Sequence, residues 1–184
     1  MESILTREQY QRVYELLDAA TPVPFDCGQV CGAVCCLDQS GISDDEAFGI
    51  FLLPGEEIVH DQSNAWLEWQ KEDCGDYEFP DSWTGTVWFV KCSGPESCRR
   101  ELRPVQCRTY PLAPYLDENK KLRVIWDDTE LPYCCPIIEE RAELQEEFVQ
   151  AVYDAWSILI TDPLIRDYVE LESSYRRGTA DIIL

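Results

Sequence analysis

Ten cysteines are the residues of this 184-residue sequence whose side chains and spacing could do chemistry. Most fall in close groups, which are C27-x3-C31-x3-C35-C36, C92-x5-C98, Cys107 within RPVQCRTYP, and Cys134-Cys135 before Pro136. Closely spaced thiolates let a short segment wrap one soft cation, and ligands from distant segments complete its shell. Because His60 is the only histidine, these ligands must be chiefly sulfur. Sulfur ligands favour zinc, Cu(I) or an iron–sulfur cluster.

The cysteines could instead form a disulfide framework or be scattered thiols of the core. Disulfides are disfavoured in a reducing compartment, where clustered thiols more often bind metal. Neighbouring cysteines such as Cys134 and Cys135 also rarely reach good bridge geometry with each other. Cysteine is a common small core residue, but scattered core residues would not fall into such groups. Metal binding is therefore the favoured interpretation.

The segment 91–108 is basic in a strongly acidic chain. The whole sequence has 36 acidic and 15 basic residues and a net charge of −21. This segment instead has five basic residues, which are Lys91, Arg99, Arg100, Arg103 and Arg108, against Glu96 and Glu101. A thiolate-bound metal is anionic, and guanidinium donors to its sulfurs would offset that charge, which makes Arg103 and Arg108 candidates for this role. Alternatively, these arginines pair with the protein's own carboxylates at the surface.

The first element that must position the cysteines is a helix over about residues 6–20. Thr6 with Gln9 three residues later is a capping box, and an apolar stripe follows at helical spacing. A proline-containing run at 21–24 ends this helix. Residues 27–36, with four of the cysteines, are predicted to be mainly loop.

Short strands are predicted in the middle of the chain. The apolar runs Ala47–Leu53 and Thr86–Val90 predict two of them, the second leading into Cys92. Glu56 and the glutamate after it suit a helix start, with a carboxylate metal ligand as the alternative. Residues 61–82 have too little periodicity to predict an element.

A hairpin and helices are predicted for the rest of the chain. Leu112–Leu116 and Leu122–Trp126 flank a five-residue polar loop, which is typical of a hairpin. The C-terminal helices cover about residues 137–177, one starting near Pro136 and one capped by Asp162. The expected fold is therefore α+β: small antiparallel strands and a hairpin with flanking helices, long cysteine-rich loops stapled by metal, and a helical C-terminus. One domain over residues 1–184 is expected, with its cluster region at about 24–138.

The composition also excludes several classes of partner and location. The field of a chain with a net charge of −21 repels phosphate backbones and anionic lipid surfaces, so no nucleic acid and no membrane is expected as a partner. The first twenty residues lack a basic start followed by an apolar run, and no later segment has the roughly 18 uninterrupted apolar residues of a membrane helix. A cytoplasmic location is expected.

Several of these segments resemble, in the same order, the zinc- or iron-chelating cysteine-cluster (CxxCxxCC, YkgJ-like) family. The matching pieces cover about residues 24–138 and are DCGQVCGAVCC (26–36), GIFLLPGEE (49–57), C92 to C98, RPVQCRTYPLAPYL (103–116) and CCP (134–136). The resemblance implies that the metal ligands are Cys27, Cys31, Cys35, Cys36, Cys92, Cys98, Cys107 and Cys135. The first motif has three residues in each gap where the family has two, and Cys74 and Cys134 have no family counterpart.

Three functions are compatible with these observations. The first is a metal-chelating protein that holds a zinc ion or an iron–sulfur cluster, 4Fe–4S included, in a structural or a metal- or redox-related role. The second, implied by the resemblance, is an iron–sulfur enzyme related to flagellin lysine N-methylase, for which no catalytic residue can be named. The third is a thiol redox module whose cysteines are made reactive by the basic segment Arg99–Arg108. No protein partner is indicated.

Overall fold

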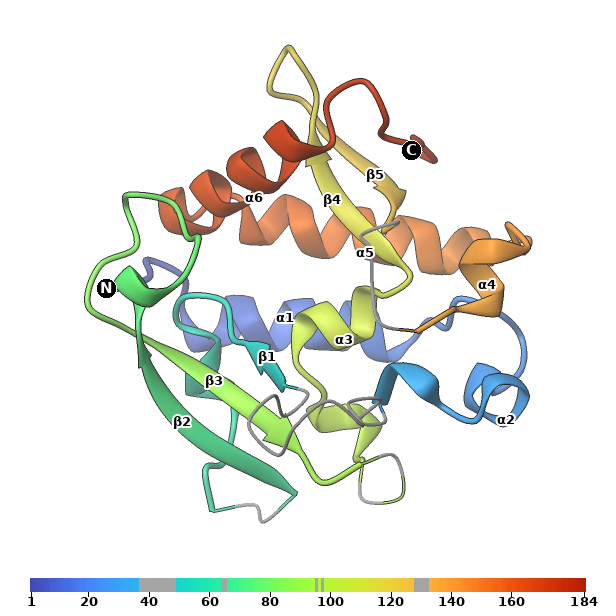
Figure 1. Ribbon diagram of the computed structural model, residues 1–184, viewed down its shortest axis with the longest axis horizontal. Coiled ribbons are helices and arrows are strands. Elements are labelled where there is room, and N and C mark those ends of the chain that lie inside the picture. The colour runs from blue at the N-terminus through green and yellow to red at the C-terminus, as the bar shows by residue number, and fades with distance from the viewer. Residues whose placement is uncertain (37–48, 64–65, 95, 97, 128–132) are drawn as a thin grey trace.

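The computed structural model describes residues 1–36, 49–63, 66–94, 96, 98–127 and 133–184 (Figure 1). Its α-helices are α1 (Arg7–Asp18), α2 (Cys27–Cys31), α3 (Val105–Thr109), α4 (Pro136–Glu139), α5 (Glu146–Leu159) and α6 (Pro163–Tyr175). Its strands are β1 (Gly49–Phe51), β2 (Leu67–Asp73), β3 (Thr86–Cys92), β4 (Leu112–Leu116) and β5 (Leu122–Trp126). One antiparallel sheet has the order β1–β3–β2, and β4 and β5 form a hairpin. The predicted α+β class is confirmed.

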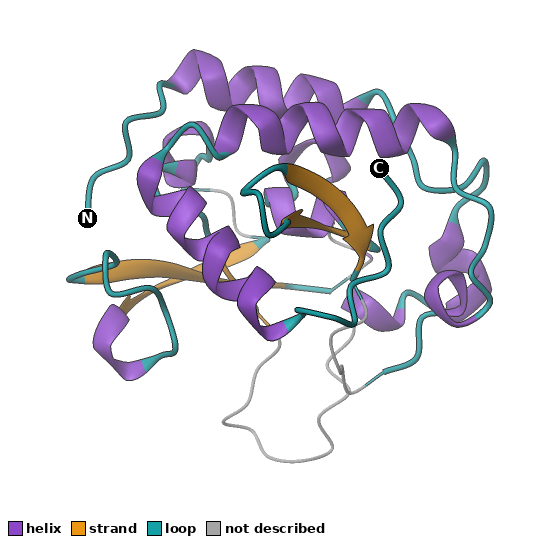
Figure 2. Cartoon of the chain, turned by 90° about the horizontal axis from the view of Figure 1, so that it is seen from above, coloured by secondary structure: helices purple, strands orange, loops and turns teal. Residues whose placement is uncertain are grey.

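The long helices hold the main apolar core. The capping box of α1 is present, because Thr6 Oγ1 accepts from the backbone N–H of Gln9 and the Gln9 side chain accepts from that of Thr6. The apolar stripe of α1 is buried and packs on α5, which lies beside it (Figures 1 and 2). The helix α6 begins at Pro163 after its cap Asp162, as the sequence predicts. This core also covers one side of the hairpin.

The hairpin is the element that the sequence predicted most accurately. It pairs Leu112 with Trp126 and Leu116 with Leu122, which are the predicted strand ends. Residues 181–184 run along the other edge of β5, where Val124 exchanges backbone hydrogen bonds with Ile183 and Leu184.

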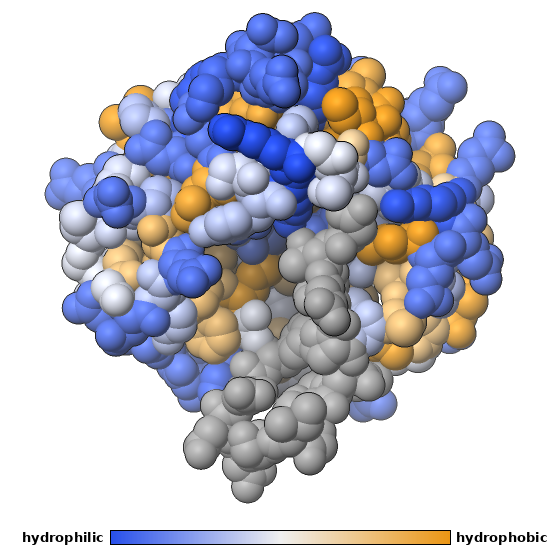
Figure 3. All heavy atoms as spheres, turned by 45° about the horizontal axis from the view of Figure 1, so that its top comes forward, coloured by the Kyte–Doolittle hydropathy of each residue, from blue (hydrophilic) through white to orange (hydrophobic). Residues whose placement is uncertain are grey.

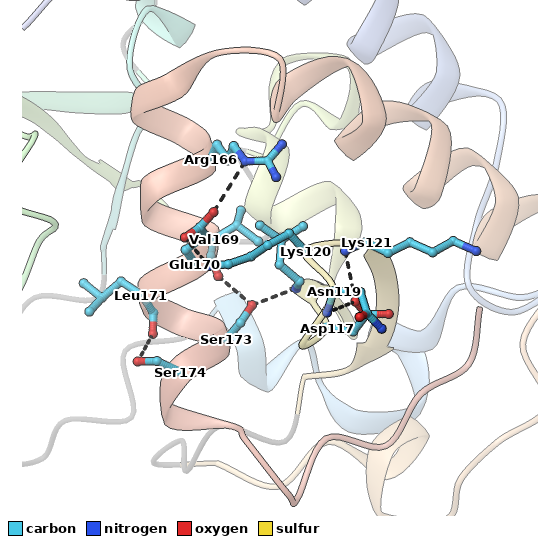
Figure 4. A network of polar contacts seen from close by, with 11 residues as sticks. Asp117, Asn119, Lys120, Lys121, Arg166, Val169, Glu170, Leu171, Ser173 and Ser174 are labelled. Carbon is cyan, nitrogen blue, oxygen red and sulfur yellow. Dashed lines mark hydrogen bonds and ion pairs between the residues drawn. The ribbon is translucent and has the colours of Figure 1, made fainter.

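A polar network fastens the hairpin to α6 (Figure 4). The buried Ser173 hydroxyl donates to the carbonyl oxygen of Val169 at 2.6 Å and accepts from the backbone N–H of Leu116 at 2.9 Å. At the hairpin loop, Lys120 forms an ion pair with Glu170 of α6. These contacts lie outside the cysteine-bearing segments.

The three-stranded sheet contains one strand that no sequence pattern predicted. The predicted strand at Thr86–Val90 is β3, which pairs along its whole length with β2. The strand β2 lies in the stretch 61–82 and was missed because only its first residue, Leu67, is buried, so its side chains show no clean alternation of apolar and polar. Of the predicted strand Ala47–Leu53, β1 forms the central part, and Ala47 and Phe48 lie outside the described residues.

Two sequence predictions of local structure are wrong. Residues 27–36 are mainly helical and not a loop, because Asp26 caps α2 and a 3-10 helix, η1 (Val34–Cys36), follows it. The single helix predicted from Pro136 is broken into α4 and α5. The break comes before Gln145, whose backbone N–H donates to the carbonyl oxygen of Pro22 and whose side chain donates to Thr21.

The surface is mostly hydrophilic on the face shown in Figure 3, with hydrophobic side chains in separate patches. Among the residues that the structure describes, no helix is long and apolar enough to cross a membrane.

Candidate metal centre

The helix α2 places two of the predicted ligands one turn apart. Cys27 is its first residue and Cys31 its last, and residues four apart lie on the same face of a helix. The Asp26 side chain accepts from the backbone N–H of Gly28 at 3.1 Å and fixes the start of the helix. Gly32 ends it with φ of 69°, a left-handed conformation that suits glycine. A cap and a glycine therefore set the two thiols on a short rigid turn.

A third thiol comes from a distant part of the chain. Cys135 is the residue before Pro136, which starts α4, and both Cys135 and Cys27 pack against the main core. Burial raises the pKa of the Cys27 thiol, and the charges of Cys31 and Cys135 raise it further. Such an effect requires the groups to be close, so the three thiols share one region. In Figures 1 and 2, α2 and α4 lie at the end of the molecule away from the three-stranded sheet.

The basic segment contributes a guanidinium to this region. Arg103 Nε donates to Cys98 Sγ at 2.9 Å. The positive charge of Arg103 also acts on Cys27, whose pKa it lowers against the larger effects of burial and of the other thiols. Arg103 therefore contacts the sulfur of one predicted ligand, Cys98.

Arg108 pairs with a carboxylate, whereas Arg103 contacts sulfur. Its Nη1 donates to Asp18 Oδ1 at 2.6 Å and its Nε donates to the carbonyl oxygen of Arg103 at 2.7 Å. This pairing with a carboxylate is the alternative that the sequence left open for the arginines. Its Nη2 is buried and has no hydrogen-bond partner in the described part of the chain.

Two tyrosines adjoin the cysteines, although no sequence pattern marks them as site residues. Burial is the main cause that raises the pKa of Tyr110 above its ordinary value. The charges of Tyr133 and Cys135 and hydrogen bonds with both residues raise it further. Burial likewise raises the pKa of Tyr133, on which Cys35 and Cys135 also act. Tyr110 is the tyrosine of the CRTYP motif, so its closeness to Cys107 in the sequence was the one available indication.

The remaining predicted ligands lie on η1, β3 and α3. Cys35 lies on η1 and acts on Tyr133, so it borders the region of Cys135. Cys92 at the end of β3 and Cys107 on α3 are exposed. Cys36 belongs to η1, but its side chain lies outside the described residues.

The two cysteines without a family counterpart differ in their surroundings. Cys74 is buried in a small apolar cluster with Trp83 and Val87. Burial raises its pKa, and the charge of Asp73 adds to the effect. Cys134 is exposed, and a hydrogen bond with Glu139 raises its pKa.

Glu56 is not available as a metal ligand in this structure. It is fully buried, and both of its carboxylate oxygens accept hydrogen bonds from protein donors. For Glu56, the alternative of a carboxylate ligand is therefore not supported.

The donor atoms of this region are of the type that a soft cation prefers, but those that the structure describes are not arranged to bind one. Cys27, Cys31 and Cys135 are thiols, and two polar groups contact sulfurs of the region as partners for a thiolate: the Arg103 guanidinium at Cys98 and the Tyr110 hydroxyl at Cys135. Across the described residues, however, no group of three or more Cys, His, Asp or Glu side chains is arranged so that it could hold a metal ion. Metal binding would require these segments to close further on the ion.

Comparisons with family models, with characterised proteins and with solved structures find no match to this chain. The resemblance to the CxxCxxCC family stays a prediction that depends on the motifs.

Proposed function

We propose that this protein chelates a soft metal, as a zinc ion or an iron–sulfur cluster, through cysteine thiolates brought together from α2, residue 98 and the start of α4. The observation that carries the proposal is the position of Arg103, which donates to Cys98 and acts electrostatically on Cys27. A cation among these thiols would offset their mutual repulsion, and a guanidinium would offset the remaining negative charge. Because the described side chains are not already in a coordinating arrangement, binding is coupled to local folding.

The redox and methyl-transfer functions have less support. A reactive redox thiol needs a lowered pKa, whereas the pKa of Cys27 is raised by burial and by its neighbouring thiols. The relationship to flagellin lysine N-methylase depends on the resemblance alone, and nothing in the described residues favours a methyl-transfer reaction.

Metal analysis of protein purified without oxygen tests the proposal. X-ray absorption at the edge of the bound metal should show a shell dominated by sulfur, with distances of about 2.3 Å if the metal is zinc. Brown protein containing iron and sulfide would identify a cluster. Protein that contains no metal and takes up neither Zn²⁺ nor iron, or a shell dominated by nitrogen and oxygen, would contradict the proposal.

Serine substitutions then identify the ligands. Cys27→Ser and Cys135→Ser should each lower the metal stoichiometry sharply, because each removes one sulfur of the group formed by Cys27, Cys31 and Cys135. Cys74→Ser makes the same chemical change in an apolar cluster and should leave the stoichiometry unchanged while lowering stability. Cys107→Ser tests the resemblance alone, because the structure shows this thiol as exposed and on a separate helix.

A further inference from the structure

Glu56 is a buried carboxylate that connects three segments of the chain; it is 0% exposed. Its Oε1 accepts from the Tyr14 hydroxyl of α1 and from the backbone N–H of Val105, the first residue of α3, each at 2.7 Å. Its Oε2 accepts from the backbone N–H of Leu53 at 3.0 Å. The Tyr14 hydroxyl has a single proton, which it donates to Glu56. The Tyr14 oxygen therefore accepts from His60 Nε2 at 2.9 Å. The carboxylate thus fixes α1, α3 and the turn before its own 3-10 helix, η2 (Glu56–Val59), at one point.

The backbone at this point is built for close packing. Gly55, just before Glu56, has φ of 85°, which a residue with a side chain rarely adopts. A Cβ atom there would also come within 2.6 Å of Ser3 Cβ. The PGEE motif therefore serves to bring the carboxylate of Glu56 into the interior.

Contacts lead from this carboxylate to the cysteine sulfur. The helix α3, which Glu56 holds at its first residue, carries Arg108, whose Cζ lies 4.3 Å from the centroid of the Tyr14 ring. Arg108 Nε donates to the carbonyl oxygen of Arg103, and Arg103 Nε donates to Cys98 Sγ. Both routes from Glu56, through α3 and through Tyr14, end at the guanidinium that contacts sulfur.

We infer that Glu56 is a positioning residue of the metal centre: it holds α3 so that Arg103 reaches the sulfur of Cys98. The inference rests on the proposed function, since it assigns Glu56 an effect on metal affinity without direct contact with the metal. Partners outside the ligand sphere typically alter metal affinity by about 10- to 100-fold when they are removed.

Glu56→Gln is the informative substitution, because it keeps the shape of the side chain. One end of the amide accepts hydrogen bonds and the other end donates them. Whichever way it turns, its NH₂ group faces a backbone N–H, either that of Leu53 or that of Val105. The variant therefore loses the acceptor on one side and the negative charge, with little change of volume.

Asp162→Asn is a matched control. Asp162 is also 0% exposed, and its carboxylate also ties separate segments together. It accepts from the hydroxyl of Ser3, the backbone N–H of Ile4 and the backbone N–H of Leu164 at the start of α6. The same acid-to-amide change there should lower the stability of the fold without removing a hydrogen bond to α3.

Two measurements on the full chain decide the inference. Titration with Co²⁺, followed by the thiolate-to-cobalt charge-transfer absorption, should show affinity about 10- to 100-fold weaker in Glu56→Gln and unchanged in Asp162→Asn. Hydrogen exchange of the metal-free protein should be faster at residues 103–110 in Glu56→Gln only. Tyr14→Phe, which removes one donor and keeps the ring, should change both readouts in the same direction by less, and it replaces Glu56→Gln if that variant does not fold.

The outcomes separate this inference from the proposed function. If the wild-type protein binds no Co²⁺ through sulfur, the proposed function fails, and hydrogen exchange alone decides whether Glu56 positions α3. Equal exchange at residues 103–110 in wild-type and Glu56→Gln protein would overturn the inference. So would equal losses of Co²⁺ affinity in Glu56→Gln and Asp162→Asn.

Discussion

Two regions of this protein are held together by different forces. The helical region, which consists of α1, α5, α6, β4 and β5, buries a continuous apolar core. The cysteine region, which consists of α2, residues 98–108 and the start of α4, contributes Val105 and Ile137 to that core. Its helix α2 has no buried residue, and Val30 there is 67% exposed. Polar contacts also hold this region, such as the bond from Arg100 Nη2 to the carbonyl oxygen of Ala20 at 2.7 Å.

The difference indicates which region a bound ligand would stabilise more. Burial of apolar surface stabilises the helical region whatever the solution contains. Most polar contacts of the cysteine region exchange bonds with water for bonds within the protein, so each contributes little net stability. A metal bound to the thiols would add the stabilising interaction that this region lacks.

The largest expected effect comes from the core of the helical region. Phe148→Ala should lower the free energy of unfolding by about 3–5 kcal/mol, because Phe148 is fully buried on α5 and its removal leaves a cavity. Chemical denaturation measures this loss, which should be similar with and without bound metal. A loss that occurs only in the metal-bound protein would show that the two regions are not distinct.

Metal removal should have an intermediate effect that is confined to the cysteine region. Hydrogen exchange at α2 and at residues 98–108 should speed up when a chelator removes the metal, whereas exchange at α5 should stay slow because its apolar face remains buried. Protein never exposed to metal, with and without the chelator, is the control. Equal protection of the cysteine region in both states would mean that the metal does not stabilise it.

Acidification should have the smallest effect, at the hairpin loop and its ion pair with α6. The backbone N–H of Lys121 lowers the pKa of Asp117 below its ordinary value of 3.8, and a hydrogen bond from Lys120 lowers the pKa of Glu170 below 4.5. Since both pKa values are lower in the folded state, these groups contribute stability above the ordinary values, which is lost as the pH falls through the folded-state values.

Asp117→Asn tests this prediction, because asparagine keeps an acceptor oxygen for the hairpin loop but does not titrate. The free energy of unfolding, from urea titrations followed by circular dichroism at several pH values, should fall slightly less on acidification in the variant than in the wild-type protein. An identical pH dependence in both proteins would show that the charge of Asp117 does not contribute to stability, which is true of many exposed charges.

The parts of the fold that the sequence predicted well depend on short-range signals. Thr6 with Gln9, and Asp162 before Pro163, mark helix starts by local hydrogen bonding and by the fixed φ of proline. The hairpin follows from two apolar runs around a polar loop. The break between α4 and α5 could not be predicted, because Gln145 is held by contacts with residues more than a hundred positions away.

The same distinction applies to the candidate site. The grouping of the cysteines made the central thiols and Arg103 predictable, because residue type and charge were sufficient. The parts played by Glu56, Tyr110 and Tyr133 depend on which segments meet in space, and no periodicity or motif spacing carries that information. The sequence therefore identified candidate ligands and missed most of the residues that surround them.

The pairing of residues 181–184 with β5 has a consequence for how the protein behaves in solution. An open strand edge offers unpaired N–H and C=O groups to another copy of the chain, and such edges promote aggregation. Here the backbone groups of Val124 on that edge are already bonded to Ile183 and Leu184. Shortening or displacing this segment should therefore reduce solubility before it reduces the stability of the helices, and an affinity tag is better placed at the other end of the chain.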